Sequence, residues 1–201
     1  MSNSIIIGLL QNTAILLAFA MLYESIWVKS EESKSVFLKI LMGLSLSAIG
    51  VVLMFTPWTL MPGIVFDTRS IMISVSGLFF GPIPTIITMA ITGAVRLLIG
   101  GNGQYMGLAV IILSGTIGLL WRKFRFDWKN KNYYLELLAM GLIVHLVMSA
   151  CTLLLPKESI WPTFKTIIGP IIFIYSPATM LLGVVMLKQY KNWQNRNAQI
   201  K

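Results

Sequence analysis

The chain has 201 residues, of which 56% are hydrophobic and 11% charged, and its formal net charge is +9. Soluble domains carry about 25% charged residues, so this composition excludes an ordinary soluble protein and indicates a polytopic membrane protein. The single cysteine, Cys151, excludes an intrachain disulfide framework and a cysteine-based metal cluster. The basic excess is expected to lie beside anionic lipid, and no nucleic-acid partner is predicted.

The N-terminal apolar run has no basic leader and no A-x-A-like cleavage site, so it is predicted to remain as the first transmembrane helix. Four further apolar runs have close to the ~20 residues that a bilayer requires. The fold class predicted is therefore an all-α, polytopic helical bundle with spans at Ile5–Trp27, Val36–Thr56, Met106–Trp121, Tyr133–Leu155 and Phe164–Leu187.

Between the second and third of these spans the pattern is broken. The apolar run Ser70–Phe80 is too short to cross a bilayer upright, and Gly81, Pro82 and Pro84 separate it from a second run, Thr85–Ile99. Such a pair is expected inside the bundle, broken or re-entrant, because irregular backbone at membrane depth must be surrounded by protein or water. The Gly81–Pro84 break is either a tight connection or a functional hinge. The total is six or seven transmembrane segments.

Lysine and arginine predict the orientation in the plasma membrane. Cytoplasmic loops are enriched in these residues, and two segments are strongly basic: the loop with Arg122, Lys123, Arg125, Lys129 and Lys131, and the tail with Lys188, Lys191, Arg196 and Lys201. The first loop, with Lys29, Lys34 and Lys39, agrees if the N-terminus is outside. Seven crossings then place the C-terminus inside, with residues 1–190 as the membrane domain and 191–201 as a cytoplasmic tail.

Two arginines, Arg69 and Arg96, stand beside the short apolar segments and, in this topology, on the outer side. A cation in the hydrocarbon core costs about 2.5 to 3.5 kcal/mol on insertion scales, so it usually faces a partner, a watery cavity or a ligand. Asp67 and the glycine turn Gly100–Gly103 are predicted to lie beside them, which suggests a small-anion site. The alternative is structural: a local Asp67–Arg69 ion pair, with Arg96 extending its head group to the lipid surface.

The segment FDTRSIMISVSGLFFGPIPTIITMAITGAVRLLIGGNGQYMGLAVIILSGTIGLLWR strongly resembles the five-transmembrane receptor region of LytS/YhcK-type bacterial sensors. The shared features are the F-D-x-R opening, the G-L-F-F-G-P break, the R-L helix end and the G-G-x-G turn. The resemblance implies a sensory module that precedes a histidine kinase or diguanylate cyclase in a two-component or related signalling system, and dimerisation is expected by the same resemblance.

The resemblance also implies ligand-binding roles. Arg69 and Arg96 would bind the ligand, which is a small carboxylate such as pyruvate for some members, and Asp67 would be their neighbour. Pyruvate-binding members also use a thiol and a hydroxyl at the start of the next helix, where this chain has Gly107 and Val110. Further candidates are the nearest polar groups, Asn102, Gln104 and Ser114.

Other residues have simpler interpretations. The only histidine, His145, is predicted to make an interhelical hydrogen bond, although a proton-sensing role is the alternative. Pro170 and Pro177 interrupt the last helix and are candidates for a kinked element that transmits a signal. The sequence contains no catalytic, cofactor-binding or metal-binding motif, so no enzyme activity is assigned.

The function predicted is a membrane receptor module that binds a small anion, expected to be a carboxylate, from outside and passes the signal to a cytoplasmic kinase or cyclase. Two rivals remain open. Broken helices around a central site also occur in secondary transporters, so a solute-transport or substrate-capture subunit is one alternative. The other is an envelope scaffold in which the arginines are anchors.

Overall fold

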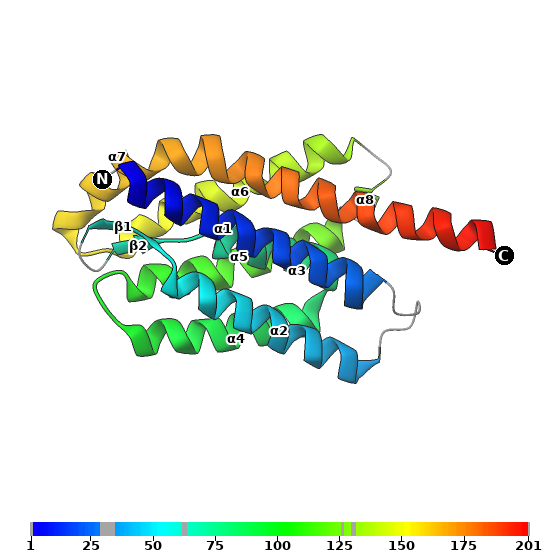
Figure 1. The fold of residues 1–201 in the computed structure, drawn as a ribbon. Coiled ribbons are helices and arrows are strands. Elements are labelled where there is room, and N and C mark those ends of the chain that lie inside the picture. The colour runs from blue at the N-terminus through cyan, green and yellow to red at the C-terminus, as the bar shows by residue number, and fades with distance from the viewer. Residues whose placement is uncertain (1, 29–34, 62–63, 126, 130–131, 201) are drawn as a thin grey trace.

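The computed structural model describes residues 2–28, 35–61, 64–125, 127–129 and 132–200. Its elements in chain order are α1 (Ser2–Leu22) with a π-helical extension η1 (Tyr23–Val28), α2 (Val36–Phe55), β1 (Trp58–Met61), β2 (Ile64–Phe66), α3 (Arg69–Phe80), α4 (Pro82–Ile99), α5 (Gln104–Phe124), α6 (Tyr133–Ala150) with a 3₁₀ turn η2 (Cys151–Leu154), α7 (Lys157–Pro170), the π-helical η3 (Ile171–Tyr175) and α8 (Ser176–Ile200). Figure 1 shows these helices gathered into one elongated bundle.

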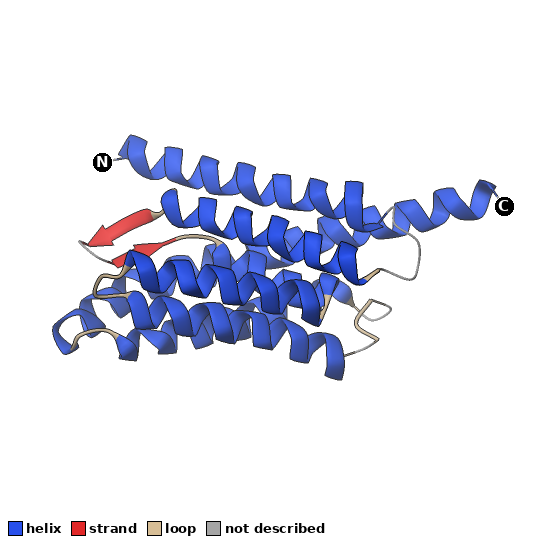
Figure 2. Ribbon diagram, turned by 90° about the horizontal axis from the view of Figure 1, so that it is seen from below, coloured by secondary structure: helices blue, strands red, loops and turns tan. Residues whose placement is uncertain are grey.

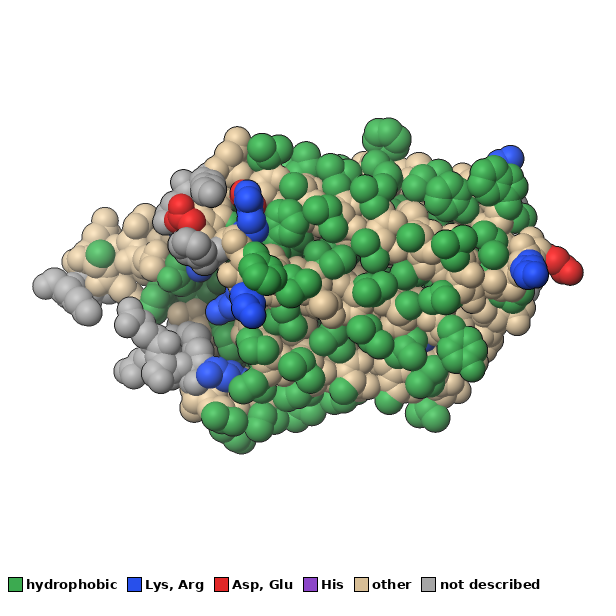
Figure 3. Space-filling model, turned by 180° about the vertical axis from the view of Figure 1, so that it is seen from behind, with side chains coloured by type: hydrophobic (Ala, Val, Ile, Leu, Met, Phe, Trp, Pro, Cys, Tyr) green, Lys and Arg blue, Asp and Glu red, His purple; other side chains and the backbone are tan. Residues whose placement is uncertain are grey.

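Five of the described helical segments are long and apolar enough to cross a membrane: Val36–Phe55, Pro82–Ile99, Gln104–Phe124, Tyr133–Leu154 and Lys157–Gln199. The shorter apolar helix Arg69–Phe80 and the apolar stretch Ala14–Val28, which belongs to α1 and η1, complete the bundle. On the face drawn in Figure 3, hydrophobic side chains cover the middle and charged side chains gather at the two ends. The predicted all-α, polytopic membrane bundle is confirmed. The β1–β2 hairpin, which the sequence analysis did not predict, is a short antiparallel addition.

The two ends of the bundle differ, and each is named here by a feature. The hairpin end carries β1, β2 and the start of α1, and the basic end carries the end of α5 and the start of α6 (Figures 1 and 2). The basic end is named for Arg122 and Lys123 in the last turn of α5 and for Lys129 in the turn that follows. Helix α1 begins at the hairpin end, whereas α8 finishes beyond the basic end. This arrangement fits an odd number of crossings, as in the predicted seven. The predicted loop and tail residues Lys29, Lys34, Lys131 and Lys201 lie outside the described residues.

Helix α3 lies in the centre of the bundle, and all of its residues are buried. It packs against α5 at very short distance, because a Cβ added to Gly118 would lie 2.1 Å from the carbonyl oxygen of Ser74, and one added to Gly77 would lie 2.7 Å from the backbone nitrogen of Leu119. Glycine is therefore required where the two helices cross, as small residues are in many membrane helix pairs.

The predicted broken pair consists of two separate helices that pack side by side. Gly81 makes the turn with φ +82°, a conformation that glycine adopts without strain. The predicted start of the second helix at Thr85 is wrong by three residues, since α4 begins at Pro82. Proline fits the first turn of a helix because the amide hydrogen it lacks would have no partner there.

The last span is longer than the predicted Phe164–Leu187, and α7, η3 and α8 form one continuous helical segment from Lys157 to Ile200. Pro170 ends α7 and Pro177 is the second residue of α8, so the π-helical η3 lies between the two prolines. Each proline removes one backbone donor, which favours a local change of hydrogen-bond register. Helix α8 continues into the predicted cytoplasmic tail, residues 191–201, as far as Ile200.

Candidate functional site: a buried arginine cavity

The start of α3 is built around a buried carboxylate. One oxygen of Asp67, Oδ1, accepts hydrogen bonds from the backbone N–H of Arg69 at 2.9 Å and from Arg69 Nε at 2.8 Å. The carboxylate thus satisfies a free donor in the first turn of the helix, where a negative charge is also favoured. The same contact fixes the direction of the Arg69 side chain, and Asp67 and Arg69 are only 5% and 8% exposed.

Asn12 of α1 holds this segment in place. Its Oδ1 accepts from the backbone N–H of Thr68 at 3.2 Å and from the Thr68 hydroxyl at 3.0 Å, and its Nδ2 donates to the carbonyl of Thr56 at 3.0 Å. One amide therefore joins α1, the end of α2 and the start of α3. The sequence analysis gave Asn12 no role at the site, although an amide inside an apolar run was the available signal.

His145 of α6 contacts the same turn from the other side. Its Nδ1 lies 2.7 Å from the carbonyl oxygen of Gly141, so this nitrogen must carry the proton and donate it. In a neutral ring, Nε2 is then an acceptor, and the hydroxyl of Ser70, 3.2 Å away, donates to it. The predicted interhelical hydrogen bond of His145 is confirmed.

Arg96 reaches the site from the last turn of α4. Its Nη1 donates to the carbonyl of Gly100 at 2.8 Å, and the residue is 4% exposed. The side chain crosses directly over Gly107 of α5, where an added Cβ would lie 2.5 Å from Arg96 Nε. The head group is therefore enclosed by protein. The structural alternative predicted instead that it extends to the lipid surface. The other half of that alternative, the Asp67–Arg69 ion pair, is present.

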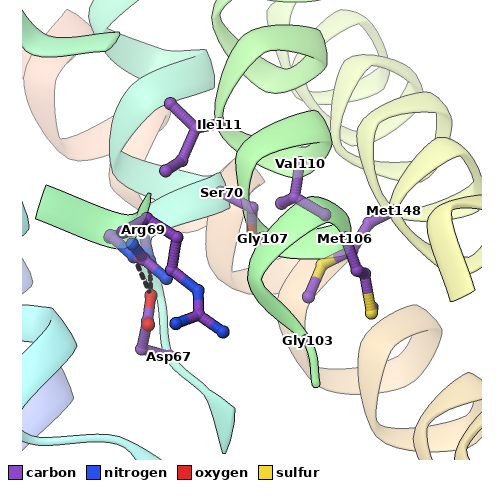
Figure 4. A pocket seen from close by; sticks show the side chains of 10 residues that line it. Asp67, Arg69, Ser70, Gly103, Met106, Gly107, Val110, Ile111 and Met148 are labelled. Atoms are coloured by element: carbon purple, nitrogen blue, oxygen red, sulfur yellow. Dashed lines mark hydrogen bonds and ion pairs between the residues drawn. The ribbon is translucent and has the colours of Figure 1, made fainter. Parts of the chain in front are cut away.

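These elements line a partly open cavity of about 40 Å³. It is lined by three charged residues, one hydroxyl and an apolar wall: Asp67, Arg69, Arg96, Ser70, Gly103, Met106, Gly107, Val110, Ile111 and Met148. In Figure 4, Asp67 and Arg69 lie on one side, with Val110, Met106 and Met148 across from them. Since one water needs about 10–15 Å³ by the same kind of measure, the cavity has room for a few waters or one small molecule.

Two buried polar atoms of residues that line this cavity have no hydrogen-bond partner among the described residues. They are Nη1 of Arg69, a donor, and Oδ2 of Asp67, an acceptor. A buried polar group without a partner costs about 1–3 kcal/mol, and more when it is charged. Atoms of this kind are satisfied when a polar ligand or a water lies beside them.

The structure brings together three of the six predicted ligand-binding residues: Asp67, Arg69 and Arg96. Asn102 is exposed in the glycine turn, Gln104 is half-buried and Ser114 is buried, and none of these three lines the cavity. Ser70 and Met148 line it but were not predicted. Ser70 adjoins the F-D-x-R motif and could have been found from it, whereas Met148 is brought to the site only by the packing of α6.

Among the residues that the structure describes, no group of three or more His, Cys, Asp or Glu side chains is placed to hold a metal ion. Cys151 is a buried free thiol. The chemistry of the cavity is therefore that of its two guanidinium groups, one carboxylate and one hydroxyl.

Comparison with known proteins gives one family match. The family model described as the 5TMR of 5TMR-LYT matches residues 6–189, which include every residue of the cavity. No curated protein and no solved structure matches the chain. The match extends over most of the 201 residues and agrees with the bundle described above, so the chain belongs to the 5TMR-LYT family of five-transmembrane receptor modules.

Proposed function

We propose that this chain is a membrane sensory module whose buried arginine cavity binds a small carboxylate from the outer face. The observation that carries the proposal is the pairing of two enclosed guanidinium groups, Arg69 and Arg96, around one cavity, with Nη1 of Arg69 left without a partner among the described residues. Guanidinium groups bind carboxylates through short, charge-assisted hydrogen bonds.

The charge of the cavity supports an anionic ligand. Two arginines and one aspartate leave one positive charge in excess among the lining residues. An unpaired charge in a low-dielectric interior is costly, so a bound monoanion would neutralise the site. The cavity volume of about 40 Å³ restricts that anion to a small one.

The distribution of basic residues supports binding from outside. Arg122, Lys123, Arg125 and Lys129 lie at the basic end, opposite the cavity, and the positive-inside bias assigns that end to the cytoplasm. The hairpin end, with the start of α3 and the cavity, then faces out. The N-terminus is outside and the C-terminus, at the end of α8, is inside.

A chain of contacts connects the cavity to the last helix. Ser70, which lines the cavity, donates to His145, and the His145 and Tyr175 rings form a T-shaped pair with centroids 5.6 Å apart at 87°. Tyr175 belongs to η3, between Pro170 and Pro177. We propose that ligand binding shifts the packing at η3 and that α8 carries the change inward, to a histidine kinase or cyclase that acts with this module as a homodimer.

Thermal unfolding of the purified protein in detergent tests the proposal. Small monocarboxylates are expected to raise the unfolding temperature, whereas their uncharged amides are not. Arg69→Ala should remove the stabilisation. The matched control is Arg196→Ala, an exposed arginine paired with Glu24 far from the cavity, which should keep it. A protein that no carboxylate stabilises would contradict the proposal.

A second measurement separates a receptor from a transporter. Vesicles containing the protein should bind labelled carboxylate without accumulating it. Accumulation driven by an ion gradient would instead support the transport alternative.

A further inference from the structure

Resting on the proposed carboxylate site, we infer that the cavity selects 2-hydroxy acids over the matching 2-oxo acids and unsubstituted acids. The geometry requires a ligand with two kinds of group: an anionic acceptor for the arginines and a hydrogen-bond donor for Asp67. A small 2-hydroxy monocarboxylate carries both on adjacent carbons.

The donors of the cavity account for the carboxylate. Nη1 of Arg69 is buried without a partner among the described residues, and Arg96 lies enclosed beside it with one hydrogen bond to Gly100. Any carboxylate would satisfy these groups. They do not distinguish one small acid from another.

The acceptors of the cavity make the distinction. Oδ1 of Asp67 already accepts from Arg69, but Oδ2 has no donor within the described part of the chain. The Ser70 hydroxyl gives its only hydrogen to His145, so toward the cavity its oxygen can only accept. Two acceptors that belong to lining residues thus lie beside the arginines. A ligand hydroxyl can donate to one of them, whereas a ketone oxygen would add a further acceptor.

Charge separates hydroxy acids from amino acids. The lining residues carry one net positive charge, which a 2-hydroxy acid monoanion cancels. An amino acid zwitterion would also supply a donor to Asp67 but would leave that charge in place, which is unfavourable in an enclosed site.

The rest of the wall limits the ligand's third substituent. Met106, Val110, Ile111 and Met148 are apolar, and the volume of about 40 Å³ favours a small substituent on the ligand. Three-carbon acids are therefore suitable probes. Lactate offers a donor, pyruvate only an acceptor, and propionate neither, and all three are monoanions of nearly equal size.

The experiment is calorimetric titration of the detergent-solubilised full chain with L-lactate, D-lactate, pyruvate, propionate and alanine. The tighter lactate enantiomer is expected to bind about 10-fold or more tightly than each of the other three acids, since those leave Asp67 Oδ2 without a donor or the site charged. Pyruvate or propionate binding as tightly as lactate would overturn the inference while leaving the carboxylate site intact. Absence of binding by all of them would overturn the proposed function as well.

Asp67→Asn provides the reciprocal test. With its oxygen kept toward the two Arg69 donors, the amide places an NH₂ group where Oδ2 was, so an acceptor becomes a donor. The lactate-to-pyruvate affinity ratio should fall at least about 10-fold, and pyruvate should become the preferred ligand. An unchanged ratio in a folded variant would contradict the role of Asp67. If the variant does not fold, the ratio in the unmodified protein still decides the inference.

Discussion

Arg69 is the first residue of α3, and Arg122 of α5 binds the other end of that helix. The two guanidinium groups have different roles. At the basic end, Nη1 of Arg122 donates to the carbonyls of Leu78 and Phe79 at 2.9 and 3.0 Å, and so caps the C-terminus of α3. At the hairpin end, Arg69 is buried and its Nη1 has no partner in the described structure. Arg122, which is exposed, has a structural role, whereas Arg69, which is buried, has a donor without a partner in the described structure. An arginine in a membrane helix is therefore informative about ligands only when its partners are known.

The largest effect is expected for Arg96→Ala, which removes the second guanidinium of the cavity. Carboxylate affinity should fall by more than about 100-fold, because truncating one partner of an enclosed charge pair typically costs about 2–5 kcal/mol. Isothermal titration measures this directly. Arg122→Ala is the matched control at the other end of α3. Equal losses of carboxylate affinity in the two variants would contradict the assignment of ligand binding to the hairpin end alone.

The packing between the two ends is tested by Gly118→Ala. The added methyl would lie 2.1 Å from the Ser74 carbonyl oxygen, a backbone atom that cannot rotate away, so α3 and α5 must separate. We expect a loss of about 3 kcal/mol in unfolding free energy, at the upper end for overpacking. Gly169→Ala in α7 is the control, because nothing lies within 4 Å of its added Cβ, and it should be neutral or slightly stabilising. Equal effects would show that α3 and α5 do not depend on this close approach.

Arg122→Ala should reduce stability by about 1–2 kcal/mol, since two carbonyls at the end of α3 lose a charged donor at a partly exposed site. Chemical unfolding in mild detergent is the measurement. Because the cavity lies at the far end of the helix, ligand affinity should change less than 3-fold or so. A large loss of affinity would mean that the two ends of α3 are strongly coupled.

The smallest effect concerns pH at the basic end. Burial lowers the pKa of Lys129 from its ordinary 10.5, and the charge of Arg122 lowers it further. Just below pH 10.5 the unfolded chain then binds more protons than the folded one at this residue, so this residue's contribution to stability rises with pH. Lys129→Met should remove that rise. Thermal unfolding of both proteins between about pH 8 and 10.5 measures the difference, and identical pH profiles would contradict it.

Much of this architecture follows from the apolar runs of the sequence. Segments such as Val36–Phe55 have only one stable form in a bilayer, because every backbone donor and acceptor must be satisfied within the helix. The helix boundaries at Pro82 and Lys157 were harder to predict from the sequence, because proline both starts and interrupts helices. The β1–β2 hairpin is too short to give a period-2 signal.

Only part of the candidate site could be predicted from the sequence. Arg69, Arg96 and Asp67 are charges in apolar surroundings and can be recognised without a structure. Their partners cannot, because the hydrogen bonds of Asn12 to Thr68 and of Ser70 to His145 span 56 and 75 residues of sequence. Short sequence motifs do not predict hydrogen bonds between residues so far apart in the chain.

The π-helical segment η3 has a geometric consequence for the helix that follows it. The backbone N–H of Ser176 bonds the carbonyl of Ile171, five residues back, which stores one extra residue in that turn. If this bond moved to the carbonyl of Ile172, the turn would become α-helical, and everything after it would rotate by about 100° and shift by about 1.5 Å along the axis. The fold thus contains, at the point where Tyr175 meets His145, a register step large enough to present a different face of α8 to its surroundings.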